Sequence, residues 1–288
     1  MDAKRARISL ASRISAYYLP NEKIESIAVS GSTARGGVDD WSDLELAVFW
    51  RDPPTMEDRD IPLSKMKAVV SRQITPKNEF LWGVDNFVLG QFPIDVVHNM
   101  STVFQKTLCE IVPKKIVEPK KQELAYISQS FEPIFGHLSL EKLKLSLGGF
   151  SSEYQQCVLE QIKFPTIGVI RTSAARGDFM HVYRNLLQGN TEILKVLCAV
   201  NGMFYPGEKR TRWLLNQFEI SPANLEEKMM SLMRGDLLES CELLHTLFEE
   251  TINIVAANTE FDVQPFRAAL TRSRRSMISP SDIDQILI

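Results

Sequence analysis

The chain has 288 residues, enough for one large domain or two ordinary ones. Hydrophobic residues make up 44% of it and charged residues 24%, so each half can bury a core of its own. Its 33 Lys and Arg against 36 Asp and Glu give a net charge of -3, which argues against a dedicated nucleic-acid-binding or membrane-surface protein.

The four cysteines are scattered and form no close pair, which is typical of buried thiols in a reducing compartment. The first residues are basic but no apolar run follows them, so no signal peptide is predicted. No apolar run approaches the roughly 18 residues that a membrane-spanning helix needs. We therefore expect a cytoplasmic protein with no membrane partner.

Up to about residue 137 the chain mixes helical and strand-like segments. Residues 3–18 place apolar side chains at helical spacing, and Pro20 follows them. Two short apolar runs, at 24–30 and 44–50, predict buried strands. The elements expected after them are a helix over 62–72, hairpin arms over 79–83 and 86–90, a strand over 92–98, a helix over 101–110 and a connection over 118–121.

From about residue 138 to residue 270, strand-like runs largely disappear and helical periodicity takes over. Its stripes of Leu, Met and aromatic residues are typical of the core of a helical bundle. Residues 272–281 are predicted to form a partly ordered tail. We therefore predict an α+β protein, in which residues 1–137 form a mixed sheet with flanking helices and residues 138–288 form an all-helical domain.

The segment between the first two predicted strands joins a turn of small residues to a pair of acids. Gly31 and Ser32 follow the first strand, where backbone N–H groups can approach a phosphate closely and the hydroxyl adds a donor. Asp43 and Glu45 are separated by one residue, so on a strand both side chains point to the same face. Two such carboxylates repel each other unless a cation lies between them, and oxygen ligands of this kind suit Mg²⁺.

A third acid lies within a β-branched run further along the chain. Asp95 is central in residues 92–98, where burial of an unpaired carboxylate would be costly. Taken alone, Asp43 and Glu45 could lie on the exposed face of an edge strand, and a Gly-Ser pair marks many tight turns. Together with Asp95 they predict a two-metal site for phosphoryl or nucleotidyl transfer, which forms only where the third strand lies beside the other two.

These residues resemble the signature of the DNA-polymerase-β-like nucleotidyltransferase superfamily: Gly31-Ser32, then Asp43-Leu44-Glu45, then Asp95 on a later strand. The sequence around Gly31 is most similar to small bacterial members. These are the antibiotic (aminoglycoside and lincosamide) nucleotidyltransferases, the nucleotidyltransferase antitoxins and relatives with a helical carboxy-terminal domain. The resemblance covers roughly residues 20–100. The family more often has Asp at the second acid, so Glu45 departs from the pattern by a longer arm.

The resemblance implies a nucleotidyltransferase fold followed by a helical domain, with ATP or another nucleoside triphosphate as substrate and two Mg²⁺ ions. It implies that Gly31 and Ser32 contact the nucleotide phosphates. It further implies that Asp43 and Glu45 bind both ions, and that Asp95 binds the catalytic ion and can help to deprotonate the acceptor hydroxyl.

Two basic residues are further candidates for nucleotide binding. Arg35 follows the Gly-Ser turn by about one helical turn, and it either pairs with a phosphate or faces solvent. Lys209 lies in a charged loop between predicted helices. Related enzymes often use a lysine of this domain on the triphosphate, and the alternative is an ordinary surface lysine. His98 is expected outside the site, because it lies on the opposite strand face from Asp95.

We therefore predict an enzyme that transfers a nucleoside monophosphate, with AMP from ATP as the first choice, to a hydroxyl of a small molecule such as an antibiotic. Pyrophosphate leaves. Two alternatives stay open: a protein-modifying adenylyltransferase of antitoxin type, and a catalytically silent nucleotide-binding regulatory module. A nucleic-acid acceptor fits poorly, because the charge is near neutral and no basic stripe with interleaved aromatic residues is present.

Overall fold

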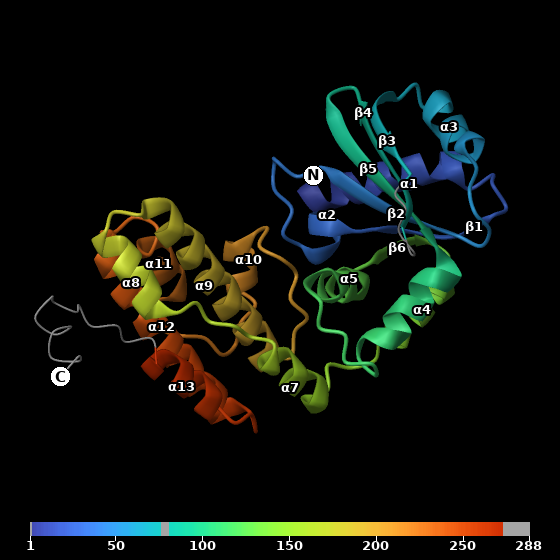
Figure 1. Ribbon diagram of the computed structural model, residues 1–288. Coiled ribbons are helices and arrows are strands. Elements are labelled where there is room, and N and C mark those ends of the chain that lie inside the picture. The colour runs from blue at the N-terminus through green and yellow to red at the C-terminus, as the bar shows by residue number, and fades with distance from the viewer. Residues whose placement is uncertain (1, 76–80, 273–288) are drawn as a thin grey trace, which may run out of the picture. The chain divides into compact units, whose positions relative to one another are not determined.

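The computed structural model describes residues 2–75 and 81–272, which form two compact units, Met1–Tyr154 and Gln155–Ile288 (Figure 1). The sequence placed the boundary after residue 137, before helix α6 (His137–Leu147). In the structure α6 packs against helix α4 and strand β1 of the first unit, so the division falls later in the chain. The predicted tail lies outside the described residues from residue 273 onwards.

The first unit is built on a mixed six-stranded sheet, as the sequence predicted. The strand order is β3-β4-β5-β2-β1-β6, in which β2 and β5 are parallel and the other neighbours are antiparallel. Because parallel neighbours need a crossover, the chain passes through α3, β3 and β4 between them. The strands are β1 (Ile24–Val29), β2 (Leu44–Trp50), β3 (Val69–Ile74), β4 (Leu81–Leu89), β5 (Phe92–Met100) and β6 (Glu132–Phe135).

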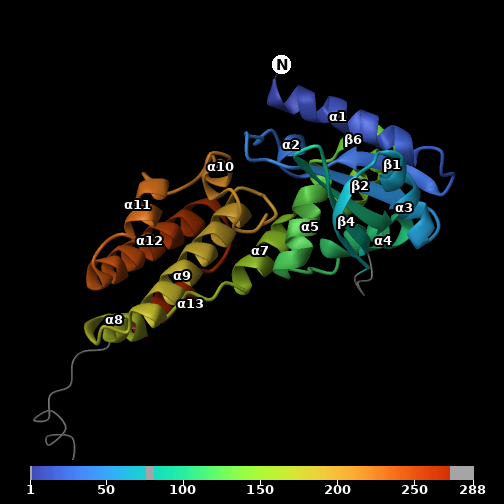
Figure 2. The same cartoon turned by 90° about the horizontal axis from the view of Figure 1, so that it is seen from above.

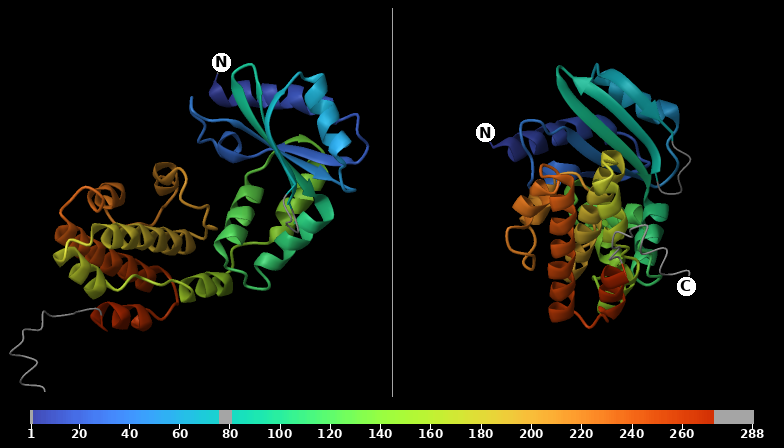
Figure 3. Two further views of the ribbon diagram at one scale, coloured as in Figure 1. Left: turned by 45° about the horizontal axis from the view of Figure 1, so that its top comes forward. Right: turned by 60° about the vertical axis from the view of Figure 1, so that its left-hand side comes forward.

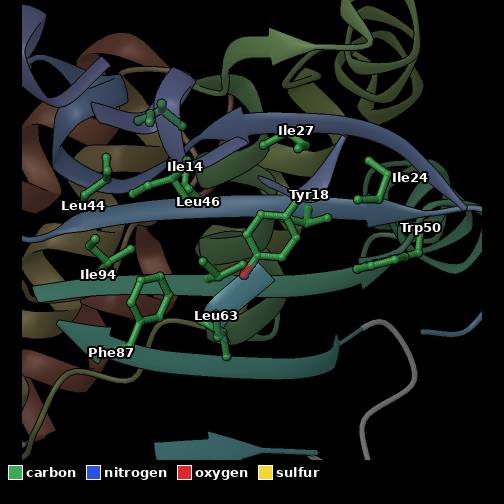
Figure 4. Close-up of a cluster of buried hydrophobic side chains, with 14 of the residues drawn as sticks. Ile14, Tyr18, Ile24, Ile27, Leu44, Leu46, Trp50, Leu63, Phe87 and Ile94 are labelled. Carbon is green, nitrogen blue, oxygen red and sulfur yellow. The ribbon is translucent and has the colours of Figure 1, made fainter. Parts of the chain in front are cut away.

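Helices cover both faces of this sheet (Figure 2). On one face, helix α1 (Ala3–Tyr18) contributes Ile14 and Tyr18 to an apolar core shared with strands β1, β2, β4 and β5 (Figure 4). On the other face, Phe49 of β2 packs edge-on against Phe104 of α4 (Ser101–Ile111) and against Phe131. Successive residues of β2 therefore pack into different cores, one on each face of the sheet. A shift of β2 by one residue would exchange these side chains between the two faces.

The helix predicted over residues 62–72 was wrong in its position. Helix α3 spans Met56–Lys65, and the β-branched residues after it form β3 instead. A capping box starts α3: the Thr55 hydroxyl accepts a hydrogen bond from the backbone N–H of Asp58, and the Asp58 carboxylate accepts one from the backbone N–H of Thr55. This local sequence signal, Thr55-x-x-Asp58, places the helix start well before Pro62.

Two further predictions in this unit were wrong. The arm predicted over residues 86–90 is part of one strand, β4, which a turn at Gly90 joins to β5; the first residues of the arm predicted over 79–83 lie outside the described residues. Residues 118–121 do not form a connection, because helix α5 (Pro119–Gln129) begins there. Proline suits the first turn of a helix, where its missing N–H removes no hydrogen bond.

The described residues of the second unit are helical apart from their connections, as predicted (Figure 3). Its long helices α9 (Phe179–Val200) and α12 (Leu237–Asn258) lie side by side. Gly189 permits this close approach, because a Cβ there would lie 2.7 Å from the Leu244 side chain. None of the described helices is long and apolar enough to cross a membrane. The other helices are α7 (Ser152–Glu160), which spans the boundary between the units, α8 (Ile167–Ala175), α10 (Thr211–Leu215), α11 (Leu225–Ser231) and α13 (Gln264–Arg272).

Candidate active site

Acids of two strands lie next to each other on one face of the sheet. Glu45 of β2 and Asp95 of β5 are direct partners in the parallel pairing, and paired residues project to the same face. Both are half-buried, whereas Leu44 and Ile94, also partners, are fully buried on the opposite face. The prediction that the strand of Asp95 lies beside the strand of Glu45 is confirmed.

Asp43 precedes β2 and is also half-buried, with the fully buried Leu44 between it and Glu45. The loop that leads to it is held by Arg7 of α1. The Arg7 Nη2 group donates hydrogen bonds to the carbonyl oxygens of Ser42 at 2.7 Å and of Asp39 at 2.9 Å. The Arg7 side chain itself is buried. Sequence reasoning missed Arg7, because nothing local to a helical arginine signals a partner more than thirty residues away.

Gly31 leaves space for the Glu45 carboxylate. It begins the short helix α2 (Gly31–Arg35) with φ of +63°, a left-handed conformation that glycine adopts without strain. A Cβ atom at Gly31 would lie only 2.0 Å from Glu45 Oε2, so the carboxylate occupies the position that a side chain would fill. The backbone N–H of Ser30 donates a hydrogen bond to the carbonyl of Glu45 at 2.9 Å. The turn and the strand acid therefore form one packed unit.

Asn86 of β4 orients the carboxylate of Asp95. The two residues are partners in the antiparallel pairing of β4 with β5, and Asn86 Nδ2 donates a hydrogen bond to Asp95 Oδ1 at 2.6 Å. Among the described residues, no hydrogen bond is recorded to the second oxygen of Asp95. Sequence reasoning did not identify Asn86, because the strand was divided at the wrong place and its register against β5 was not predicted.

The other candidates for nucleotide binding are placed as follows. Ser32 is buried in α2, next to Gly31. Arg35 is half-buried, and its guanidinium lies 5.9 Å from the ring centroid of Tyr126 on α5, a cation–π contact. The sequence left open whether Arg35 faces solvent or binds a phosphate. In the structure its guanidinium contacts the ring of Tyr126 instead. Lys209 belongs to the second unit, where it is exposed in the segment before α10, and its role on the triphosphate stays a prediction.

A buried polar network supports the strands from the opposite side. Asp85 of β4 receives a hydrogen bond from His98 Nε2 of β5 at 2.8 Å and forms an ion pair with Arg59 of α3. Trp50 Nε1 can only donate, and it lies 3.1 Å from His98 Nδ1. His98 therefore holds its proton on Nε2 and is neutral. His98 lies on the opposite face of β5 from Asp95, as the sequence predicted.

Burial and hydrogen bonds determine the charge states of His98 and Asp85. Burial lowers the pKa of His98, and this effect outweighs the hydrogen bond and charge of Asp85, which would raise it. Burial alone would raise the pKa of Asp85, but the hydrogen bonds from His98 and Arg59 hold it below its ordinary value. Asp85 is thus ionised beside Arg59. Because Asp85 and Asn86 are consecutive on β4, the network anchors the strand that presents Asn86 to Asp95.

The donor set suits a hard cation, although no closed metal site is preformed. Within residues 2–75 and 81–272, no three His, Cys, Asp or Glu side chains are grouped so as to hold a metal ion. Two carboxylates in register, Glu45 and Asp95, nevertheless match what Mg²⁺ uses, which is one or two carboxylates with phosphate oxygens and water as the other ligands. The Glu45 carboxylate lies in the space that the missing side chain of Gly31 leaves. The residues present fit Mg²⁺ that arrives together with a phosphate.

Comparison with known proteins gives little further guidance. No protein-family model matches the chain, and no curated protein matches its sequence. Among solved structures, it is similar to a nucleotidyltransferase-like protein from Exiguobacterium sibiricum 255-15, with 14% identity and a TM-score of 0.40. The match covers 96% of this chain and 83% of that one.

Proposed function

We propose that the protein is a Mg²⁺-dependent nucleotidyltransferase. The observation that carries this proposal is the pairing of Glu45 with Asp95 on neighbouring parallel strands, with the Glu45 carboxylate in the space left by Gly31. Two carboxylates side by side on one sheet face repel each other, and a cation bound between them relieves this repulsion. The adjoining turn of small residues is where a nucleotide phosphate can come close to the backbone.

In this reaction the acceptor hydroxyl oxygen attacks the α-phosphorus of the nucleoside triphosphate. A new phosphorus–oxygen bond forms, the bond between the α-phosphorus and the bridging oxygen breaks, and pyrophosphate leaves. Asp95 accepts the hydroxyl proton, and Asn86 holds its carboxylate in position. Mg²⁺ bound by Asp43, Glu45 and Asp95 would neutralise charge on the phosphates. Ser32 and Arg35 contribute donors to those phosphates.

ATP is the nucleotide that we propose, and a hydroxyl of a small molecule is the acceptor. The test incubates the protein with Mg²⁺ and each α-labelled nucleoside triphosphate, against aminoglycosides, lincosamides and proteins of a cell lysate. Label on a small molecule supports the proposal. Label on a protein identifies an antitoxin-type enzyme, and binding of nucleotide without transfer to any acceptor identifies a regulatory module and contradicts the enzyme.

Matched variants separate the site from the fold. Asp43→Asn and Asp95→Asn should each lower transfer by at least about 100-fold, because each removes a carboxylate charge that would hold the cation at the reacting phosphate. Asp52→Asn removes an exposed acid just after β2 and should leave transfer unchanged. Full activity of Asp95→Asn would contradict the assignment of the site.

A further inference from the structure

A cavity of about 650 Å³ lies within the helical unit, among α9, α10 and α11. A volume of this size suits a small organic ligand. Leucines and methionines from the three helices and from the turn after α11 supply its apolar lining, and the methionines can adapt to different shapes. They are Leu187, Leu194, Leu215, Met229, Met230 and Met233.

One polar side chain in the lining is buried without full hydrogen bonding. Asn190 of α9 is only 9% exposed, and among the described residues its Oδ1 atom has no hydrogen-bond partner. An unsatisfied buried amide oxygen destabilises the folded state unless a donor reaches it. The amide can turn about its Cβ–Cγ bond at little cost, because this torsion is broad, and so can present its oxygen to a ligand in the cavity.

The two arginines that line the cavity differ in their pairing. Arg212 is bound to Glu226 at 2.6 Å, and Thr191 donates a hydrogen bond to Glu208 at 2.6 Å. Arg234 is exposed and also lines the cavity, and within the described part of the chain it forms no ion pair. A ligand that fills the apolar lining can therefore place an anionic group at this guanidinium.

We propose that this cavity binds an amphipathic organic anion with three features. Its body is aromatic or aliphatic and contacts the leucines and methionines. An N–H or O–H group donates to Asn190 Oδ1, and a carboxylate or sulfonate pairs with Arg234. Every lining residue belongs to the helical unit, and none of them is among the residues assigned to nucleotidyl transfer.

The test uses two fluorescent probes on the full-length protein. 8-Anilinonaphthalene-1-sulfonate has an aromatic body, one N–H and an anion, and N-phenyl-1-naphthylamine has the same body and N–H without the anion. Both should bind the wild type with one site per chain. Mg²⁺ and ATP should not displace them; displacement would place the probe at the nucleotide site and overturn the proposal, as would the absence of any bound probe.

Variants test each contact. Asn190→Leu should weaken both probes about 3- to 10-fold, the effect of one lost hydrogen bond. Arg234→Gln should weaken the sulfonate probe about 2- to 5-fold and leave the neutral probe unchanged. Arg176→Gln removes an exposed arginine outside the lining and is the control.

Unchanged binding of both probes to Asn190→Leu would overturn the site, and unchanged binding of the sulfonate to Arg234→Gln would overturn its anionic part. If Asn190→Leu does not fold, Met230→Trp decides, since it fills the cavity from a partly exposed position. It should abolish binding of both probes, and unchanged binding would overturn the site.

Discussion

Gly31→Ala should remove the proposed activity at a small cost in stability. The structure gives two separate effects of the added methyl group. The residue must keep a left-handed backbone with φ of +63°, which costs a non-glycine residue about 1–2 kcal/mol. The new Cβ would also lie 2.0 Å from Glu45 Oε2, so the carboxylate must move away by about 1 Å.

The second effect is the one that matters for function. A displacement of about 1 Å in a group that positions the substrate can lower a rate by about 100-fold. Gly36→Ala is the matched control. Gly36 is the C-cap of the same short helix with φ of +83°, so the backbone strain is comparable, but a Cβ there would have no neighbour within 4 Å. The two variants should lose similar stability, and only Gly31→Ala should lose function.

The loss of function can be measured without knowledge of the acceptor. Electron paramagnetic resonance monitors the binding of Mn²⁺ in the presence of ATP. Urea unfolding measures the stability of the same samples. We expect at least a 10-fold weaker Mn²⁺ affinity for Gly31→Ala and an unchanged affinity for Gly36→Ala. Equal affinities for the two variants would refute the reasoning that Glu45 is a metal ligand held in place by the missing side chain of Gly31. Glu45→Asp in the Gly31→Ala background shortens the arm and should restore part of the affinity.

Three further predictions concern residues that support the site. Arg7→Met should weaken Mn²⁺ binding several-fold, because the loop before Asp43 loses its hydrogen bonds from Arg7. An unchanged Mn²⁺ affinity in a calorimetric titration would contradict this. Arg59→Met should destabilise the protein by about 3–5 kcal/mol in urea unfolding, since it leaves the buried Asp85 carboxylate without its cation and with only the hydrogen bond from the neutral His98. A change below about 1 kcal/mol would contradict a buried ion pair. Asp58→Asn should cost about 1–2 kcal/mol at pH 7. Burial alone would raise the pKa of Asp58, but hydrogen bonds from Lys23 and the α3 cap lower this pKa from 3.8 to about 2. That stability is complete above the unfolded pKa and is lost as the pH falls from about 4 towards 2, so a difference independent of pH would contradict it.

The acid pattern was readable from the sequence because it follows the period of a strand. Asp43 and Glu45 alternate with Leu44 and Leu46, and such alternation fixes which side chains share a face. Asp95 stood out since an acid within an apolar run needs a reason. The sequence could not specify the pairing of Glu45 with Asp95, because strand register depends on contacts between residues far apart in the chain.

The supporting residues were not predicted, and the reason is physical. Arg7, Asn86 and Arg59 look like ordinary polar residues of amphipathic elements, and each finds its partner only through the tertiary fold. The misplaced α3 is different, because its capping box was present in the sequence. Thr55 and Asp58 alone, at the spacing of a capping box, predict the start of α3.

Strand β4 links the core to the candidate site through two consecutive residues. Side chains alternate along a strand, so Asp85 faces the buried network while Asn86 faces Asp95. A shift of β4 by one residue would place Asp85 beside Asp95 and leave Arg59 and His98 without their partner. Two carboxylates would then face each other, and a guanidinium would be buried unpaired; each change is unfavourable. The ion pair in the core therefore selects the register that keeps the Asp95 carboxylate oriented. This gives a physical reason for a costly buried charge to be present next to a candidate active site rather than an apolar side chain.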